Sequence, residues 1–233
     1  MNNKGQLQLP GVMEQGAGKL RIYSGFSFTI KPEILSLSCG IVSGPKWVSK
    51  SCRQFPNHKI VLDNGAYPAW VAGADLGFND QLGAVLEAAE VASAKGLLEY
   101  IIACDIVGAG AKSWARTMQS LEPLSSYRLL LPVQEGVDIE QAVSVCKDHG
   151  AGLFIGGKTF AFKVKAARQI AGRVYTHAGR INRDGWLWTF SRLVDAVDST
   201  SWVRSQHWNQ KTNWAQMLRR YAVFDGLDSS APE

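Results

Sequence analysis

The chain has 233 residues, of which 46% are hydrophobic and 19% are charged. This balance is that of a globular domain, and it excludes a disordered or fibrous protein. The longest apolar runs, such as residues 100–104, have the length of a strand, which excludes a membrane-spanning helix. The formal net charge of +5 is compatible with a polyanionic partner and does not by itself establish one.

The polar stretch at residues 1–18 lacks the apolar core of a signal peptide, so we expect a protein of the cytoplasm, or of the host cytoplasm if a phage encodes it. The length suits one domain, placed at residues 19–224, with a flexible tail over 225–233. The cysteines are scattered and form no Cys-x-x-Cys pair, which predicts reduced thiols, no zinc site and no other cofactor. They are Cys39, Cys52, Cys104 and Cys146.

Short runs rich in β-forming residues recur along the chain and predict strands. The polar connection over residues 43–58, which contains two prolines, is predicted to be a loop. The predicted strands cover residues 20–23, 34–39, 59–63, 100–105, 128–134, 152–155, 173–177 and 194–197.

From the third strand onward, apolar residues at helical spacing predict a helix after each strand. Asp138 is predicted to cap one of these helices, with Gln141 in capping-box register, and Gly172 to end the next. A closing helix is expected over residues 209–224. This alternation in one domain predicts a (β/α)8 TIM-type barrel. An open, doubly wound sheet is the alternative, because strand order cannot be read from one sequence.

Acidic, amide or glycine residues stand where the predicted strands end, and in a barrel these ends meet around one mouth. Each has an ordinary alternative explanation. A strand-end aspartate begins a turn or caps a helix, a glutamine is a polar turn residue, and paired glycines form a tight turn or cradle phosphate at a helix N-terminus. The residues are Asp63, Asp105, Gln134, Gly156-Gly157, Gly179 and Asp198.

The motifs at these strand ends resemble those of the tRNA-guanine transglycosylase superfamily. The similarity is closest to its compact, phage- and island-borne branch of DNA-modifying deazapurine transglycosylases, the DpdA family, and it extends from about Leu62 to Trp202. In chain order the motifs are Asp63-Asn64-Gly65-Ala66-Tyr67, Asp105, Pro132-Val133-Gln134-Glu135-Gly136, Phe154-Ile155-Gly156-Gly157, His177-Ala178-Gly179 and Asp195-Ala196-Val197-Asp198.

The resemblance implies a role for each matched position. Asp198 is implied to be the nucleophile that attacks C1′ of the target nucleotide, and Asp63 the general acid/base that handles the exchanged base. Five further matches are implied to bind the base: Tyr67 by stacking, Asp105 and Gln134 through its edge, Gly156-Gly157 through backbone contacts to exocyclic groups, and Gly179 by close approach.

The residue types suit this chemistry. Base exchange at C1′ passes through an oxocarbenium-like state, so a carboxylate that forms a covalent sugar ester divides one displacement into two easier steps. A second carboxyl group gives a proton to the leaving base and takes one from the incoming base. A carboxylate at position 105 could accept the two adjacent donors of a guanine edge. His177 is interpreted as a core histidine and not as a catalytic group.

Basic residues that follow the sixth and seventh strands are predicted to grip phosphates around a flipped nucleotide. Their alternative is a solvated helix face. Trp202 lies among interleaved aromatic and basic residues, a pattern used for stacking on exposed bases. The predicted nucleic-acid contacts are Lys158, Lys163, Arg180, Arg183 and Trp202.

The chain departs from tRNA-acting members of the family, because it has no cluster of cysteines and histidine for zinc and no long region after Asp198. We therefore expect no zinc subdomain and a DNA substrate, in which guanine is exchanged for a 7-deazaguanine derivative such as preQ0. Accessory modification proteins remain open as partners, and no membrane is expected. The alternatives are the same exchange on tRNA, or a non-catalytic barrel that binds nucleic acid or a purine.

Overall fold

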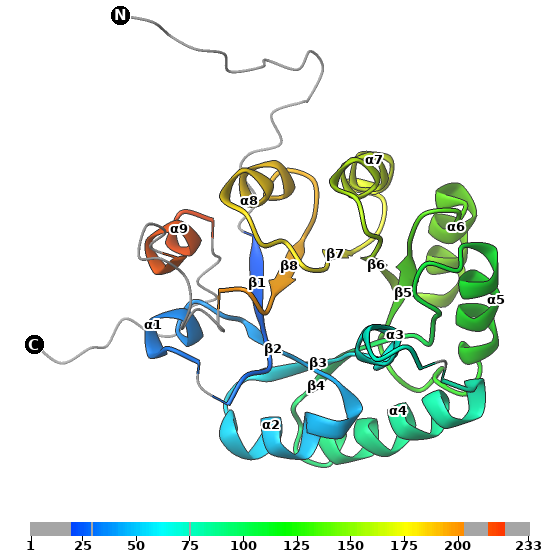
Figure 1. Ribbon diagram of the computed structural model, residues 1–233, viewed down its shortest axis with the longest axis horizontal. Coiled ribbons are helices and arrows are strands. Elements are labelled where there is room, and N and C mark those ends of the chain that lie inside the picture. The colour runs from blue at the N-terminus through cyan, green and yellow to red at the C-terminus, as the bar shows by residue number, and fades with distance from the viewer. Residues whose placement is uncertain (1–19, 29, 75, 203–213, 222–233) are drawn as a thin grey trace, which may run out of the picture.

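A computed structural model describes residues 20–28, 30–74, 76–202 and 214–221. Its strands form a closed barrel in the order β1-β2-β3-β4-β5-β6-β7-β8, and all neighbours are parallel (Figure 1). The first and last strands pair with each other, with Arg21 opposite Ala196. The predicted (β/α)8 barrel is thus confirmed, and the open sheet is excluded.

The strands are short and largely buried, as expected for a parallel sheet that is covered on both faces. Their bounds are β1 (Arg21–Gly25), β2 (Gly40–Ser43), β3 (Lys59–Leu62), β4 (Leu98–Ile102), β5 (Leu129–Val133), β6 (Gly152–Ile155), β7 (Thr176–Ala178) and β8 (Ala196–Ser199).

Most helices form a ring outside the barrel, whereas α3 is drawn within the ring of strands, after the carboxyl end of β3 (Figure 1). None of the helices in the described part of the chain is long and apolar enough to span a bilayer. The helices are α1 (Pro32–Leu35), the 3-10 turn η1 (Pro45–Trp47), α2 (Val48–Gln54), α3 (Ala66–Val71), α4 (Phe78–Ser93), α5 (Ala111–Ser120), α6 (Ile139–His149), α7 (Phe160–Ile170), α8 (Asp184–Phe190) and α9 (Trp214–Arg219).

The second strand was predicted in the wrong place. Residues 34–39 contain the end of α1 and a turn, and β2 begins only at Gly40. Pro32 in the first turn of α1, followed by Glu33, favours a helix start, and this outweighs the β-forming residues after it. The first position of β2 requires a glycine, because a Cβ on Gly40 would lie 2.5 Å from the carbonyl oxygen of Lys59.

The predicted loop over residues 43–58 is also wrong, because it contains η1 and α2. Val48 and Cys52 are one helical turn apart and are both buried, so the helix packs an apolar stripe on the barrel. Helix α3 begins at Ala66, three residues after Asp63. The predicted cap of α6 is present, since a carboxylate oxygen of Asp138 accepts hydrogen bonds from the backbone of Glu140 and Gln141.

Two apolar clusters form the core. The larger lies between the strands and the surrounding helices, whereas the smaller consists of strand residues and fills the barrel itself. The interior cluster includes Val61 and Ala196. Because side chains alternate along a strand, residues two positions further on face the same interior, toward the carboxyl end of the barrel. Those residues are Asp63 and Asp198.

The predicted leader at residues 1–18 and the predicted tail at 225–233 lie outside the described residues. The predicted closing helix over 209–224 is described at residues 214–221, where α9 is found.

Candidate active site

Asp63 and Asp198 lie at the carboxyl mouth of the barrel. Asp63 directly follows β3, and Asp198 is the third residue of β8, so it belongs to the strand and does not follow it as predicted. The two carboxylates are close enough that the negative charge of Asp198 is among the causes that raise the pKa of Asp63. The structure thus brings together the two acids that stand far apart in the sequence.

Both oxygens of Asp198 are held by hydrogen bonds. Nε2 of His177 lies 2.9 Å from Oδ2, and the backbone N–H of Arg180 donates to Oδ1 at 3.1 Å. Asp198 is 7% exposed and His177 is fully buried. An ionised carboxylate only accepts, so this contact requires a proton on Nε2 of His177. Asp198 is therefore fixed in orientation at the end of its strand.

His177 is a site residue that the sequence interpretation set aside. It lies on β7, paired with Ala196 of β8, and its ring is 5.2 Å from the ring of Tyr23 and 5.5 Å from that of Phe154. These rings place the imidazole inside the barrel, beneath the carboxylate. The available signal was its period-two spacing from Gly179, which directly follows β7, because residues two positions apart face the same side of a strand.

Asp63 sits in an environment that favours its protonated form. Burial is the largest cause that raises its pKa above the ordinary range, and the charge of Asp198 adds to it. The backbone N–H of Gly65 donates to its Oδ1 at 3.2 Å, which opposes the shift. A carboxyl group with a raised pKa can hold a proton and release it to a substrate, as a general acid must.

Asp105 is oriented by two amide side chains. Asn64 donates to its Oδ1 at 2.9 Å, and Gln134 donates to its Oδ2 at 3.2 Å. Burial raises the pKa of Asp105 to about 6, the Asn64 hydrogen bond opposes this, and the charge of Asp63 adds to it. Asp63, Asp105 and Asp198 therefore form one electrostatically coupled group of carboxylates.

Gln134 does not match the base-contacting role implied for it. Its Nε2 donates not only to Asp105 but also to the backbone oxygen of Ile106 at 2.9 Å and to Oγ of Ser113, and its Oε1 accepts from Gly108. The side chain is 4% exposed. Both amide hydrogens are used inside the protein, so Gln134 positions Asp105 and the loop after β4.

Two aromatic residues of helix α3 make cation–π contacts with basic side chains from loops across the mouth. The guanidinium of Arg180 lies 4.1 Å from the ring centroid of Tyr67, and Nζ of Lys158 lies 4.6 Å from that of Trp70. Arg180 has a φ of 59°, the sparsely populated left-handed region. Arg180 thus covers a face of the ring that was predicted to stack on a purine, and a base can use that face only after Arg180 moves.

The loop after β6 does not offer a free phosphate site. The carboxylate of Glu135 accepts hydrogen bonds from the backbone N–H groups of Lys158 and Thr159, each at 3.0 Å, just before α7. An internal anion therefore occupies the position that the phosphate alternative requires. The Gly157 backbone has a φ of 74°, and a Cβ there would lie 2.6 Å from the ring of Phe162.

Gly179 and Lys163 are linked beneath the mouth. A Cβ at Gly179 would lie 2.3 Å from Cζ of Phe154, so the glycine leaves room for that interior ring. Its carbonyl oxygen accepts a hydrogen bond from Nζ of Lys163 at 2.6 Å. Lys163 is 3% exposed, and burial lowers its pKa to about 8. The prediction that Lys163 contacts phosphate is wrong, because its ammonium group is turned inward.

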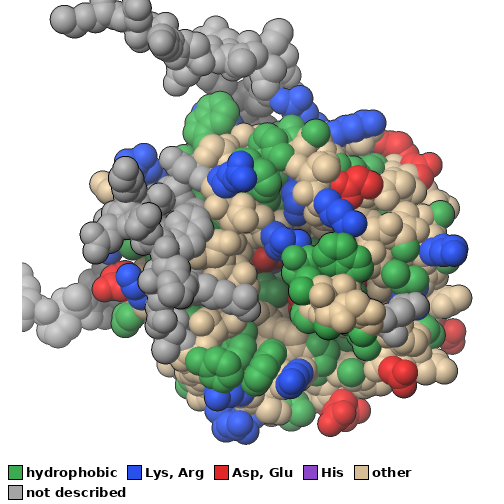
Figure 2. Space-filling model, viewed as in Figure 1, with side chains coloured by type: hydrophobic (Ala, Val, Ile, Leu, Met, Phe, Trp, Pro, Cys, Tyr) green, Lys and Arg blue, Asp and Glu red, His purple; other side chains and the backbone are tan. Residues whose placement is uncertain are grey.

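Trp202 is also buried, at 1% exposure, and its Nε1 donates to Oγ of Ser24 at 3.3 Å. The prediction that it stacks on an exposed base is therefore wrong. Lys158, Arg180 and Arg183 are exposed, and Arg183 lies 5.4 Å from the ring centroid of Trp186. Figure 2 shows basic side chains around a central hollow in which acidic atoms are visible.

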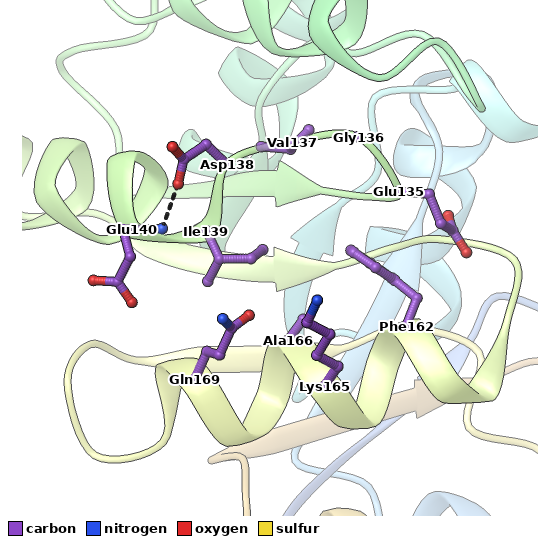
Figure 3. A pocket seen from close by; sticks show the side chains of 10 residues that line it. All are labelled: Glu135, Gly136, Val137, Asp138, Ile139, Glu140, Phe162, Lys165, Ala166 and Gln169. Carbon is purple, nitrogen blue, oxygen red and sulfur yellow. Dashed lines mark hydrogen bonds between the residues drawn. The ribbon is translucent and has the colours of Figure 1, made fainter.

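Two cavities flank this region. One of about 100 Å³ lies beside Asp105 and is lined by Ala66, Ala69 and Trp70 of α3. This volume is below the roughly 300 Å³ at which ligand pockets usually begin, and Asp105 itself is partly exposed beside it. The other, of about 320 Å³, lies outside the barrel, where Lys165 and Gln169 of α7 face the start of α6 (Figure 3). None of Asp63, Asp105 and Asp198 lines it.

Within the described residues, no group of three or more histidine, cysteine or acidic side chains could hold a metal ion. A scan of the sequence against models of known protein families finds no match, and a search of curated proteins finds no relative. The fold and the mouth define a class, a (β/α)8 barrel with a coupled carboxylate cluster at the carboxyl end of its strands.

Proposed function

We propose that this protein is a base-exchange transglycosylase that replaces guanine in DNA with a 7-deazaguanine derivative such as preQ0. The observation that carries the proposal is the pairing of Asp198 and Asp63 at one barrel mouth. Asp198 is anchored through both oxygens, and Asp63 has a pKa raised by burial and by that neighbour. One carboxylate is suited to bond the sugar and the other to carry the proton.

In the first step, Asp198 attacks C1′ of the target nucleotide and the bond from C1′ to N9 of guanine breaks. Asp63 gives its proton to the departing guanine, and a sugar ester of Asp198 remains. In the second step, N9 of the incoming base attacks C1′, its proton passes to Asp63, and the ester bond breaks. Both carboxyl groups then return to their starting states.

The hydrogen bonds to Asp198 support the second step in particular. As the ester breaks, negative charge develops on the carboxylate that leaves C1′. The N–H groups of His177 and Arg180 already point at its oxygens and stabilise that charge without rearrangement.

Asp105 supplies a recognition element for a guanine-like edge. Guanine and its 7-deaza analogues carry two adjacent donors, N1–H and the exocyclic amine, and an ionised carboxylate can accept both. Each oxygen of Asp105 accepts one internal hydrogen bond, from Asn64 or from Gln134, and keeps further acceptor capacity. These amides hold the carboxylate in one plane for the base.

A polymer substrate must deliver its nucleotide to the mouth in a flipped conformation. The exposed cations at the mouth, Lys158, Arg180 and Arg183, suit contact with phosphates beside that nucleotide. Arg180 contributes both to positioning the nucleophile and to the cationic rim of the mouth, because its backbone N–H binds Asp198 while its side chain covers Tyr67.

The test is to express the chain in cells that supply preQ0, digest DNA and tRNA separately to nucleosides, and search each pool for deazaguanosines by mass spectrometry. We expect the modified nucleoside in DNA, and its loss with Asp198→Ala. Modification of tRNA alone would show that the protein performs the same base exchange with tRNA, and not DNA, as its substrate. Absence from both pools, in a folded protein that still binds purines, would contradict a transglycosylase and favour a binding barrel.

A further inference from the structure

An aromatic cluster that the sequence interpretation did not single out lies on the β1 and β2 side of the mouth. It consists of Phe26, Phe28 and Trp47, and we name it the rim cluster. The ring of Phe28 is 5.5 Å from that of Phe26 and 5.3 Å from that of Trp47. Phe28 is 52% exposed and Trp47 is 38% exposed. A cluster of exposed aromatic rings in mutual contact marks an interaction surface, whereas a single exposed ring does not.

Lysines lie over these rings. Nζ of Lys50 is 4.0 Å from the ring centroid of Phe28, and Nζ of Lys46 is 5.3 Å from that of Trp47. Both lysines are exposed. The surrounding segment, residues 26–59, contains Glu33 as its single acidic residue against several lysines and arginines. The rim cluster therefore combines aromatic faces with a local excess of positive charge.

The rim cluster borders the carboxylates. The backbone N–H of Phe26 donates to Val42 at the end of β2, and that of Asp63 donates to Ser43, the next residue. A Cβ built on Gly65 would lie 3.6 Å from Cδ of Pro45, so η1 also adjoins the start of α3. Figure 2 shows hydrophobic and basic side chains together on this part of the mouth face.

The rim cluster is held in place before any ligand binds. Trp47 stacks on Phe26, with ring centroids 5.9 Å apart and an interplanar angle of 28°. Nε2 of Gln54 in α2 donates to the backbone oxygen of Phe28 at 2.8 Å, which fixes the segment that carries the exposed ring. A preorganised aromatic surface loses little entropy when it binds a partner.

We propose that the rim cluster is a docking surface for single-stranded nucleic acid, in which Lys46 and Lys50 turn from the rings to bind phosphates and unpaired bases stack on the faces of Phe28 and Trp47 that the lysines leave. Aromatic faces together with cations match the two chemical features of an unpaired strand, its bases and its phosphates. An acidic peptide would use the lysines but not the rings. The inference rests on the proposed function in one respect, that the strand continues from the rim cluster to Asp198.

Binding can be measured apart from catalysis in an Asp198→Asn background, which cannot form the sugar ester. The probe is a short fluorescent oligothymidylate, followed by anisotropy. We expect Trp47→Ala to weaken binding about tenfold, the effect of removing one base stack. Trp188→Ala is the matched control. That tryptophan is 47% exposed with Arg192 4.4 Å from its ring, but it lies on α8, across the barrel from α2 (Figure 1).

The lysines are tested through salt dependence. Replacing both Lys46 and Lys50 by alanine should reduce the slope of log affinity against log salt by about 0.7 for each phosphate that the protein no longer neutralises. Lys147→Ala, an exposed lysine at the end of α6, should leave the slope unchanged. The lysine variants also keep the test decisive if Trp47→Ala fails to fold, which thermal melting would reveal.

Equal binding by the wild-type and rim-cluster variants would overturn the inference, as would an equal loss of affinity from Trp188→Ala. Competition by polyglutamate as strong as by oligothymidylate would also overturn it and assign the surface to acidic peptides. Failure of base exchange in an enzyme that still binds through the rim cluster would count against the proposed function alone.

Discussion

Nε2 of His177 lies 2.9 Å from Oδ2 of Asp198, inside the barrel and below its mouth. Among the described residues, Nδ1 of the same ring is buried and has no hydrogen-bond partner. The imidazole therefore directs its one satisfied hydrogen bond at the carboxylate. This relationship makes His177 a positioning residue for Asp198.

Replacing His177 by leucine should slow release of the sugar from Asp198 about 100-fold, because one donor to the developing carboxylate is removed. The sugar ester should then accumulate, and the intact mass of acid-quenched enzyme measures it. His177→Gln, which can still donate an N–H, is the control and should recover part of the rate. An unchanged rate with no ester in the leucine variant would show that this hydrogen bond has no part in turnover.

Asp63→Asn should lower the rate of base exchange about 100-fold or more, because the amide cannot transfer the proton. The same change should stabilise the fold at neutral pH. Burial raises the pKa of Asp63, so the folded state loses stability relative to the unfolded state as the pH rises above the ordinary value of about 4, and the loss is complete once the pH passes the raised pKa. Below about 4 both states are protonated and there is no cost. The gain in melting temperature over wild type should therefore shrink as the pH falls toward 4. A gain that does not change with pH would contradict this account.

Asp105 should make base binding dependent on pH. Its pKa is about 6, and the ionised form is needed to accept two donors from the base. Affinity for a free deazaguanine should be constant above that value and fall about tenfold for each pH unit below it. Isothermal titration of the Asp198→Ala protein between pH 5 and 8 measures this. Asp105→Ala should bind weakly with no such dependence, and a retained dependence would assign the titration to another group.

The sequence was a good guide to the barrel and a poorer guide to its contacts. Continuous apolar strands that end in acids predict both the fold class and the mouth location of Asp63 and Asp198, since parallel strands all point the same way. Residues 34–39 misled because β-forming residues followed a proline that starts a helix. The β-forming residues favour a strand there while the proline favours a helix start, and the packing of the folded chain determines which of the two forms.

Side-chain partners could not be predicted, because they depend on register around the closed barrel. The contact between His177 and Asp198 joins neighbouring strands, and the Glu135 carboxylate reaches the next loop to fill the N-terminus of α7. The burial of Lys163 and Trp202 could not be predicted from the sequence either. A basic or aromatic residue has the same sequence signature whether its end faces water or turns inward.

Gly179→Ala should destabilise the protein by about 1–3 kcal/mol, because the added methyl group would overlap the ring of Phe154 in the filled barrel interior. Chemical denaturation of purified protein measures the change in unfolding free energy. Gly185→Ala is the matched control, since a Cβ at that helical position has no neighbour within 4 Å. It should be neutral or stabilising by up to about 1 kcal/mol. The double variant Gly179→Ala, Phe154→Leu should recover part of the stability, because the smaller side chain makes room for the methyl group. If the double variant is as unstable as the sum of the two single changes, the overlap with Phe154 is not the cause, and the hydrogen bond from Lys163 to Gly179 becomes the alternative explanation.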